Sequence, residues 1–398
     1  MVSDGIQNTS GTLARAPALA AAPVAARCRE YGLDWLRIMA FVILIAYHTG
    51  MYFVSWPWSV KNAELSDRLT WVMIFFNRWR LPLLFFISGA GTWFNLRRRG
   101  YGEFALERLR RLAVPLAFGM FVIVPPQIYV ERVLAGTHYA SYLEFWGTVF
   151  AFVPYPTGNL SWHHLWFLAY ILTYSLLGLP LFAILRTPSA RALVDRLARL
   201  CEFPIFIYLL NVPSIVAALI LRPHWPVTNN LTSDWANFTG SLLTFLWGFI
   251  ICGSDRFLGL VERRRHEFLF IAVGTLILFY GIRLDNALAT FPALGRRWIF
   301  TLVDSYLAMA VILTLVGWSR ARLNRDSAAL RYANTAVYPF YIFHQTITVL
   351  LGYAWLDWHV PIALKFPLLF AGTFLGSWVL YEAVRRFRVT RVLVGMKA

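Results

Sequence analysis

Long apolar blocks constrain the fold of this 398-residue chain more than any other feature. Hydrophobic residues make up 59% of it and charged residues 14%, against ~45–50% and ~25% in soluble domains. The blocks approach the ~20 residues that an α-helix needs to cross a bilayer. The predicted fold class is therefore an all-α, polytopic membrane bundle of about ten spans. We place them at roughly 35–54, 70–95, 111–130, 163–185, 203–221, 236–253, 267–283, 298–318, 332–354 and 363–384.

The chain divides into one membrane domain and two short tails. Residues 1–29 are rich in Ala, Ser, Thr and Pro, and we expect a disordered cytoplasmic tail there. Residues 30–385 form the predicted transmembrane domain, and 386–398 a basic cytoplasmic tail. The three cysteines are far apart and show neither a metal-binding spacing nor a disulfide framework.

The net charge of +17 is a signal of orientation in the membrane. Alternate connections and the two tails hold 26 Lys and Arg residues, whereas the remaining connections hold six. The positive-inside rule then places both termini in the cytoplasm. Topology accounts for the charge without nucleic-acid binding, so we expect the lipid bilayer as a partner and no nucleic acid.

Three polar residues in the first span form the clearest candidate site. Asp34 and Arg37 are three residues apart on one helical face, a spacing that also suits a simple ion pair. His48 follows Arg37 by eleven residues, close to three helical turns, so both side chains project from the same face ~16 Å apart. A cation at the inner mouth and a titratable base deeper in one groove suit a long anionic ligand from the cytoplasm. A packed structural histidine is the alternative reading of His48.

Asp304 in the eighth span is the candidate partner of His48. Both residues lie about six positions from the outer end of their spans, so their depths should match. A carboxylate beside the imidazole would orient it, as in hydrolytic triads. The alternative is an ion pair of Asp304 with Arg296 or Arg297, or capping by its neighbours.

Three further residues are candidates for substrate binding: Arg80, His164 and His344. Arg80 could hold a carboxylate, carbonyl or glycan oxygen, or it could be an interfacial arginine that reaches outward. His163 and His164 are adjacent and point ~100° apart on a helix, so a shared metal is not expected. His344 near the middle of the ninth span is as consistent with a structural role as with a functional one.

Five sequence blocks resemble a known family. They are the Arg37–His48 spacing, RLPLLFFISGAGTWF from Arg80, ERLRRLAVP from Glu107, HHLWFLAYIL from His163 and NTAVYPFYIFHQTI from Asn334. In this order they resemble the acyltransferase 3 family of membrane-bound O-acyltransferases. The HLWFL block, with the long outer loop before it, is most similar to the glucan-modifying branch of that family.

The resemblance implies a reaction and assigns roles to residues. Acyl-CoA would bind from the cytoplasm as a co-substrate, and no permanently bound cofactor is expected. An acetyl or succinyl group would pass to a carbohydrate hydroxyl outside the bacterial inner membrane, with succinylation of periplasmic glucan implied by the branch. His48 would act as base or carry the acyl group transiently, and Arg37 would help to bind the donor. Phosphates suit arginine forks, and in the basic run Arg108, Arg110 and Arg111 we favour the last two as donor ligands because they lie closer to the span.

Two other classes of protein stay open on the sequence alone. A secondary transporter or glycan carrier would use His48, Asp304 and His344 as a proton relay and would not depend on acyl-CoA. A non-catalytic membrane scaffold would tolerate the loss of His48 and Arg37 together. The Arg37–His48 spacing favours the enzyme.

Overall fold

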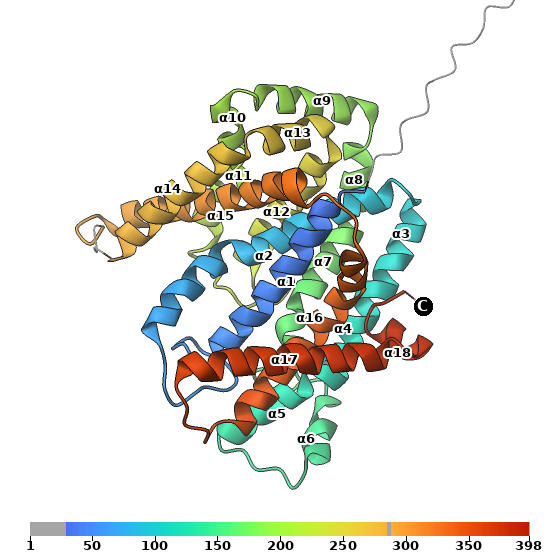
Figure 1. Cartoon of the computed structure of the whole chain (residues 1–398), viewed down its shortest axis with the longest axis vertical. Coiled ribbons are helices and arrows are strands. Elements are labelled where there is room, and N and C mark those ends of the chain that lie inside the picture. Colours follow the sequence, from blue (N-terminus) through green and yellow to red (C-terminus); the bar gives the residue numbers. More distant parts are fainter. Residues whose placement is uncertain (1–28, 285–287, 398) are drawn as a thin grey trace, which may run out of the picture.

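The computed structural model describes residues 29–284 and 288–397 and is built from α-helices (Figure 1). Within these residues the β pairing is a single isolated bridge between Pro154 and Leu160. The predicted tail at 1–29 lies, apart from Arg29, outside the described residues. The helices are α1 Tyr31–Met51, α2 Asp67–Leu96, α3 Tyr101–Arg108, α4 Val114–Phe118, α5 Pro125–Leu134, α6 Tyr142–Val149, α7 Trp166–Leu177, α8 Leu179–Leu185, α9 Pro188–Leu200, α10 Pro204–Leu209, α11 Val212–Leu221, α12 Trp235–Gly253, α13 Asp255–Arg263, α14 Arg265–Leu284, α15 Ala293–Leu323, α16 Ala328–Ala354, α17 Ile362–Val384 and α18 Arg388–Leu393.

The all-α membrane bundle is confirmed, but the count of about ten spans is not. In the described part of the chain, seven helical segments are long and apolar enough to cross a bilayer, or eight if α7 and α8, bent by 58°, form one span. The other two expected spans correspond to α2 and α16. Both are long enough to cross, but they are less apolar because polar residues interrupt them.

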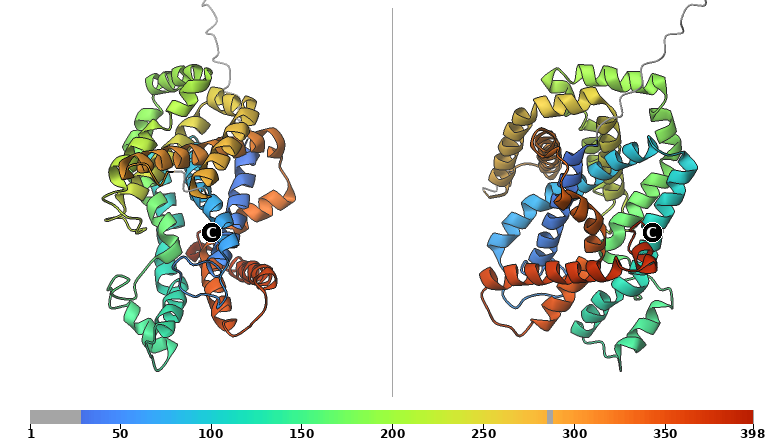
Figure 2. Two further views of the ribbon diagram at one scale, coloured as in Figure 1. Left: turned by 90° about the vertical axis from the view of Figure 1, so that its left-hand side faces the viewer. Right: turned by 45° about the vertical axis from the view of Figure 1, so that its right-hand side comes forward.

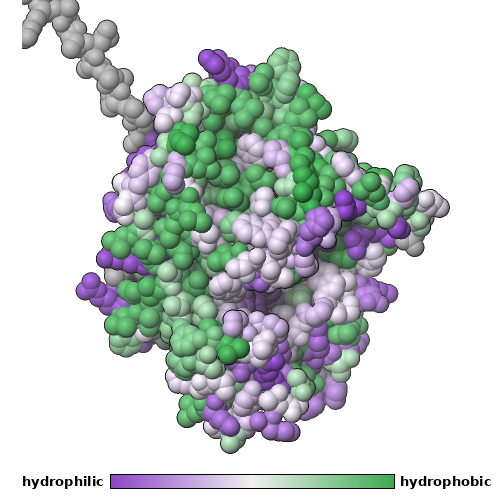
Figure 3. Space-filling model, turned by 180° about the vertical axis from the view of Figure 1, so that it is seen from behind, coloured by the Kyte–Doolittle hydropathy of each residue, from purple (hydrophilic) through white to green (hydrophobic). Residues whose placement is uncertain are grey.

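Helix α1 lies at the centre of the bundle, against α2, α15, α16 and α17 (Figure 1). Helices α9, α10 and α13 gather at the end of the molecule that the sequence predicts to be cytoplasmic (Figure 2). Apolar side chains cover much of one face of the molecule, while hydrophilic side chains gather around a hollow lower on that face (Figure 3). An apolar outer surface of this kind suits contact with lipid.

Small residues let α2 and α12 approach closely. A Cβ on Gly89 would lie 1.8 Å from the carbonyl oxygen of Phe245, and one on Gly248 would lie 1.9 Å from that of Phe86. The Ser88–Gly91 run of α2 therefore serves packing at Gly89. At Gly91 an added Cβ would meet nothing within 4 Å, because that position borders a cavity.

The third predicted span is one helical segment, Tyr101–Leu134, that contains two π-helical stretches. They are η1, Leu109–Ala113, and η2, Gly119–Ile123. A π-helical stretch inserts an extra residue into a turn and rotates the side chains beyond it. The first stretch contains Arg110 and Arg111, so it affects which arginines face the bundle interior.

Candidate active site

Two histidines on neighbouring helices form the centre of the site. The Nδ1 atom of His48 on α1 lies 2.7 Å from the Nε2 atom of His344 on α16, and the two rings are nearly parallel, at 10°. His344 is fully buried, with 0% exposure, whereas His48 is partly exposed. The partner of His48 is thus a second histidine and not the carboxylate that the sequence analysis expected.

The contacts of His344 determine the tautomer of both rings. His344 Nδ1 lies 2.7 Å from the carbonyl oxygen of Tyr341 and 3.1 Å from that of Phe340. Carbonyl oxygens only accept hydrogen bonds, so His344 carries its proton on Nδ1 and accepts through Nε2. His48 must then donate from its own Nδ1. This leaves a lone pair on His48 Nε2, to which no protein group in the two described ranges hydrogen-bonds.

A third histidine, His164, lies behind this pair. It precedes α7, and its ring centroid is 5.5 Å from that of His344. His164 Nε2 lies 3.0 Å from the carbonyl oxygen of Ile342, and its Nδ1 is 3.4 Å from Gln127 Nε2. Gln127 in turn donates to Thr346, at 2.7 Å. The network joins α5, the turn before α7, and α16, and it holds the backbone around His344.

The predicted direct contact of His164 and His344 with substrate does not fit this arrangement. Exposure is 5% for His164 and 0% for His344, and the hydrogen-bonding atoms of both point at protein groups. Both rings form hydrogen bonds to other protein groups inside the bundle, where an unpaired polar group would cost free energy. In this structure His344 holds His48 directly, and His164 holds the backbone next to His344.

The predicted pairing of Asp304 with His48 is wrong. The carboxylate of Asp304 lies 3.3 Å from Arg78 on α2 and 3.3 Å from Arg222, just beyond α11. It borders a different cavity, between α2, α11, α12 and α15. Equal depth along two spans does not fix the direction of a side chain around its helix axis, and α15 directs Asp304 away from α1.

Arg80 is buried against Tyr47, the residue before His48, and does not reach outward to the interface. Its exposure is 4%, its guanidinium carbon lies 3.3 Å from the ring centroid of Tyr47, and it donates to Asn77 at 2.7 Å. Tyr47 precedes His48 on α1. A buried cation without a carboxylate partner among the described residues is suited to an anionic or carbonyl group of a ligand.

Arg37 lies where cavities meet at the predicted cytoplasmic end. It contacts Asp34 at 3.0 Å, so the expected ion pair is present, and it donates to Asn334 on α16 at 2.6 Å. A cavity of about 700 Å³ beside it is lined by seven basic side chains and no acidic one. They are Arg29, Arg37, Arg111, Arg331, Arg385, Arg391 and Lys397.

A narrower cavity of about 290 Å³ leads from these arginines into the bundle. One part of it is lined by the arginines Arg37, Arg108 and Arg111, and another part by the aromatic rings of Phe41 and Tyr341. The Phe41 and Tyr341 rings touch edge to face at 5.4 Å, and the Tyr341 ring lies 6.0 Å from that of His344. The cavity thus extends toward the histidine pair, with the Phe41–Tyr341 contact between them.

Arg108 and Arg111 line this cavity, and Arg110 does not. Arg108 and Arg111 are three positions apart, whereas Arg110 is exposed on the outside of the π-helical stretch. The predicted choice of Arg110 as a donor ligand is therefore not supported by its position. The sequence analysis did not choose Arg108 as a donor ligand. Its three-residue spacing from Arg111, which puts both on one helical face, could have indicated it.

No group of three or more His, Cys, Asp or Glu side chains in the described residues is arranged to hold a metal ion. The three converging histidines use ring nitrogens on carbonyl oxygens and on each other. The arrangement offers instead a free imidazole nitrogen on His48, a buried cation at the neighbouring Tyr47, and a basic cavity that approaches from one end.

The helix bundle, the histidine pair between α1 and α16 and the arginine-lined cavity together define a multi-pass membrane protein with a candidate active site inside the bundle. Comparison with known families makes the class specific. The chain belongs to the family described as "Acyltransferase domain", which matches residues 30–382, and it is an O-acyltransferase. The resemblance found in the sequence is thereby confirmed.

Curated relatives agree with this assignment. The Glucans biosynthesis protein C of Salmonella typhimurium (strain LT2) is 24% identical over 338 residues, which cover 81% of this chain and 83% of the relative. The protein of the same name from Escherichia coli O139:H28 is 23% identical over 345 residues, covering 83% and 84%. No solved structure matches the chain significantly.

Proposed function

We propose that this acyltransferase moves an acetyl or succinyl group from cytoplasmic acyl-CoA to a carbohydrate hydroxyl on the outer side of the bacterial inner membrane. The observation that carries the proposal is the hydrogen-bond chain from the Tyr341 carbonyl through His344 to His48, which leaves His48 Nε2 free to accept a proton. The names of the relatives favour a glucan as the acceptor.

The basic cavities support acyl-CoA as the donor. CoA carries phosphates, and the planar fork of arginine binds a phosphate through two parallel hydrogen bonds. Arg37 and Arg111 border both the 700 Å³ cavity and the narrower one that continues toward the histidines. The phosphates would lie among the arginines, and the thioester arm would extend along α1 toward His48.

The reaction follows from the tautomer of His48. His48 Nε2 takes the proton of the sugar hydroxyl while the hydroxyl oxygen attacks the thioester carbonyl. The tetrahedral intermediate then collapses, the carbon–sulfur bond breaks, and His48 returns the proton to the departing thiolate. His344 stabilises the imidazolium because its Nε2 accepts from His48 Nδ1. Arg80, whose guanidinium stacks on Tyr47 next to His48 in the chain, would stabilise the oxyanion.

The orientation of the chain gives the reaction its sidedness. The end of α1 that carries Arg37 belongs to the side with most basic residues, and the end that carries His48 belongs to the other. The donor would thus enter from the cytoplasm, and the acceptor from the outer side.

Acyl transfer across proteoliposomes tests this proposal. Labelled succinyl-CoA or acetyl-CoA is supplied on one side and a periplasmic-type β-glucan on the other, and label on the glucan is measured. Wild-type protein should acylate the glucan only when the donor is on the arginine side. His48→Ala should lower the rate by about 10²- to 10⁴-fold, the usual contribution of a general base.

A matched control is His266→Ala, which removes a histidine on α14 at the predicted cytoplasmic end, far along the chain from the pair. It should keep wild-type activity. Acylation at the wild-type rate by the His48 variant would refute the mechanism. Movement of glucan across the membrane without any acyl-CoA would instead identify a transporter.

A further inference from the structure

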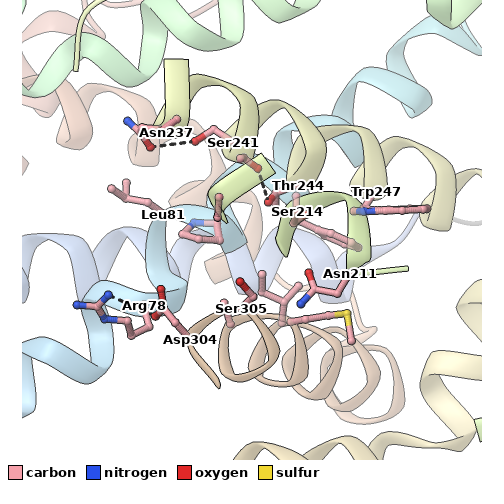
Figure 4. Close-up of a pocket in the computed structure, with 18 of the residues that line it drawn as sticks. Arg78, Leu81, Asn211, Ser214, Asn237, Ser241, Thr244, Trp247, Asp304 and Ser305 are labelled. Carbon is pink, nitrogen blue, oxygen red and sulfur yellow. Dashed lines mark hydrogen bonds and ion pairs between the residues drawn. The ribbon is translucent and has the colours of Figure 1, made fainter. Parts of the chain in front are cut away.

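A second large cavity borders α2, and none of the three histidines of the candidate active site lines it (Figure 4). It has a volume of about 570 Å³ and is lined by α2, α11, α12 and α15, together with Trp166 of α7, Ile207 of α10 and the segment after α11. Both Ala236 and Ile251 of α12 line it, and fifteen positions of an α-helix span ~22 Å. The cavity thus runs along most of the ~30 Å hydrocarbon thickness of a bilayer.

The two ends of this cavity differ in chemistry. The end near the predicted outer surface is lined by charged residues, Arg78, Arg222 and Asp304. The part near the predicted cytoplasmic side is lined by apolar residues, among them Ile207, Ile251 and Leu313. A ligand that fills the cavity must be polar and anionic at one end and apolar at the other.

The charged end has a surplus of positive charge. Asp304 accepts one contact from each arginine, at 3.3 Å in both cases, longer than the ~2.7–2.9 Å of a strong charge-assisted hydrogen bond. Each guanidinium has five N–H donors, so most remain available. The Nε of Arg78 has no partner among the described residues although water cannot reach it. Two arginines that share one carboxylate suit a phosphate group.

An unpaired amide lies deeper in the cavity wall. Asn211 stands at the break between α10 and α11, is 7% exposed, and its Nδ2 has no hydrogen-bond partner within residues 29–284 and 288–397. Figure 4 shows Asn211, Ser214 and Ser305 around this stretch of the cavity. A buried amide donor without a partner costs free energy, and a ligand carbonyl would offset that cost.

We propose that this cavity binds one membrane glycerophospholipid with an anionic head. Its phosphate would contact Arg78 and Arg222, an ester carbonyl would accept from Asn211, and a hydrocarbon chain would lie along Ile207 and Ile251. The order of the three features along the cavity matches the order of the three chemical groups in such a lipid. The inference concerns a site separate from the one proposed for acyl transfer and does not depend on it.

Native mass spectrometry of the full chain tests the proposal. The protein is released from nanodiscs of phosphatidylethanolamine and phosphatidylglycerol at 3:1, without acyl-CoA, and retained lipid is counted. Wild type should retain one phosphatidylglycerol in preference to the more abundant neutral lipid. Ser214→Trp fills the cavity and should reduce that retention at least about fivefold. Val216→Trp is the matched control, since Val216 is on the same helix and 46% exposed, and it should behave as wild type.

A second variant keeps the test decisive if Ser214→Trp does not fold. Arg222→Ala removes an arginine whose side chain is 52% exposed, and it should abolish the preference for phosphatidylglycerol while the amount of neutral lipid stays unchanged. Equal retention by the Ser214 and Val216 variants would overturn the site. Equal affinity of wild type for the two lipids would overturn the anionic head.

Discussion

The hydrogen bond between His48 and His344 gives the candidate base its orientation. In hydrolytic triads a carboxylate fixes the tautomer of the histidine and stabilises its charged form. Here a neutral histidine, itself fixed by main-chain carbonyls, fixes the tautomer. The positioning group carries no negative charge, so the imidazolium of His48 gains less stabilisation than a carboxylate would provide.

His344 is therefore a positioning residue whose loss should lower turnover. In His344→Ala the Nδ1 proton of His48 loses its acceptor, and the ring is free to adopt the other tautomer. We expect kcat to fall roughly ten- to hundredfold, less than the ~10²–10⁴-fold loss on removing a general base because His48 itself remains, with KM for acyl-CoA unchanged. Steady-state kinetics on purified protein measure both. A raised KM with unchanged kcat would show that His344 contacts the donor instead.

The arginines of the third span separate into two groups by position. Arg108→Ala and Arg111→Ala should each raise KM for acyl-CoA about ten- to hundredfold, the equivalent of ~1.5–3 kcal/mol for a lost contact to phosphate. Both side chains border the cavity that approaches the histidines. Titration of acyl-CoA against single variants provides the measurement, with kcat expected to hold.

Arg110→Ala is the matched control for these variants. Arg110 is exposed and lines none of the cavities described at this end, so its removal should leave KM within about twofold of wild type. A loss of affinity in the Arg110 variant equal to that of the others would return it to the donor site. It would also contradict the orientation that the π-helical stretch gives to this segment.

At the scale of whole elements, the face that α1 presents to α16 organises the site. Arg37 donates to Asn334, and His48 pairs with His344, so both ends of one face of α1 contact the same neighbouring helix. The eleven-residue spacing predicted this shared face, and the contacts confirm it. Any change in the angle between α1 and α16 would separate the histidines, which makes the packing of these two helices part of the catalytic geometry.

The contact between α2 and α12 should be the most sensitive to added volume. Ala normally stabilises a helix interior relative to Gly by about 1 kcal/mol. In Gly89→Ala the new methyl group would collide with the Phe245 carbonyl, so we expect a net loss of stability of ~1–3 kcal/mol. Thermal unfolding in detergent should show a lowered Tm.

Gly91→Ala is the control on the same helix. Its new methyl group would meet nothing within 4 Å, so the intrinsic helix preference of Ala should leave Tm equal or higher. If both variants lose stability to the same extent, the close approach of α2 and α12 does not limit packing. If neither loses stability, the two helices can separate at little cost.

At the scale of the whole molecule, the proposed reaction requires a fixed orientation in the membrane. The two tails and the connections at one end hold 26 basic residues, and the connections at the other end hold six. Reporter fusions after residue 398 and within the 131–162 loop should report opposite sides, with the chain terminus in the cytoplasm. Reports from the same side would remove a span between them and refute the separation of donor and acceptor.

The sequence alone determined the features that depend on local periodicity and composition. Apolar blocks of sufficient length force helices, because a bilayer offers no partners for main-chain polar groups. Helical spacing placed Arg37, Asp34 and His48 on one face, and the ordered motifs indicated the family. Each of these follows from residues close together in the chain.

Only the tertiary structure decided which distant residues meet. His48 and His344 are 296 positions apart, and Asp304 is directed toward Arg78 and Arg222 because of the rotation of α15 about its axis. Sequence gives the depth of a residue along a span, but the angle around each helix depends on how all neighbouring helices pack. The three-residue spacing of Arg108 and Arg111 puts both on one helical face, but only the packing of the helices shows that this face borders the inner cavity while Arg110 is exposed.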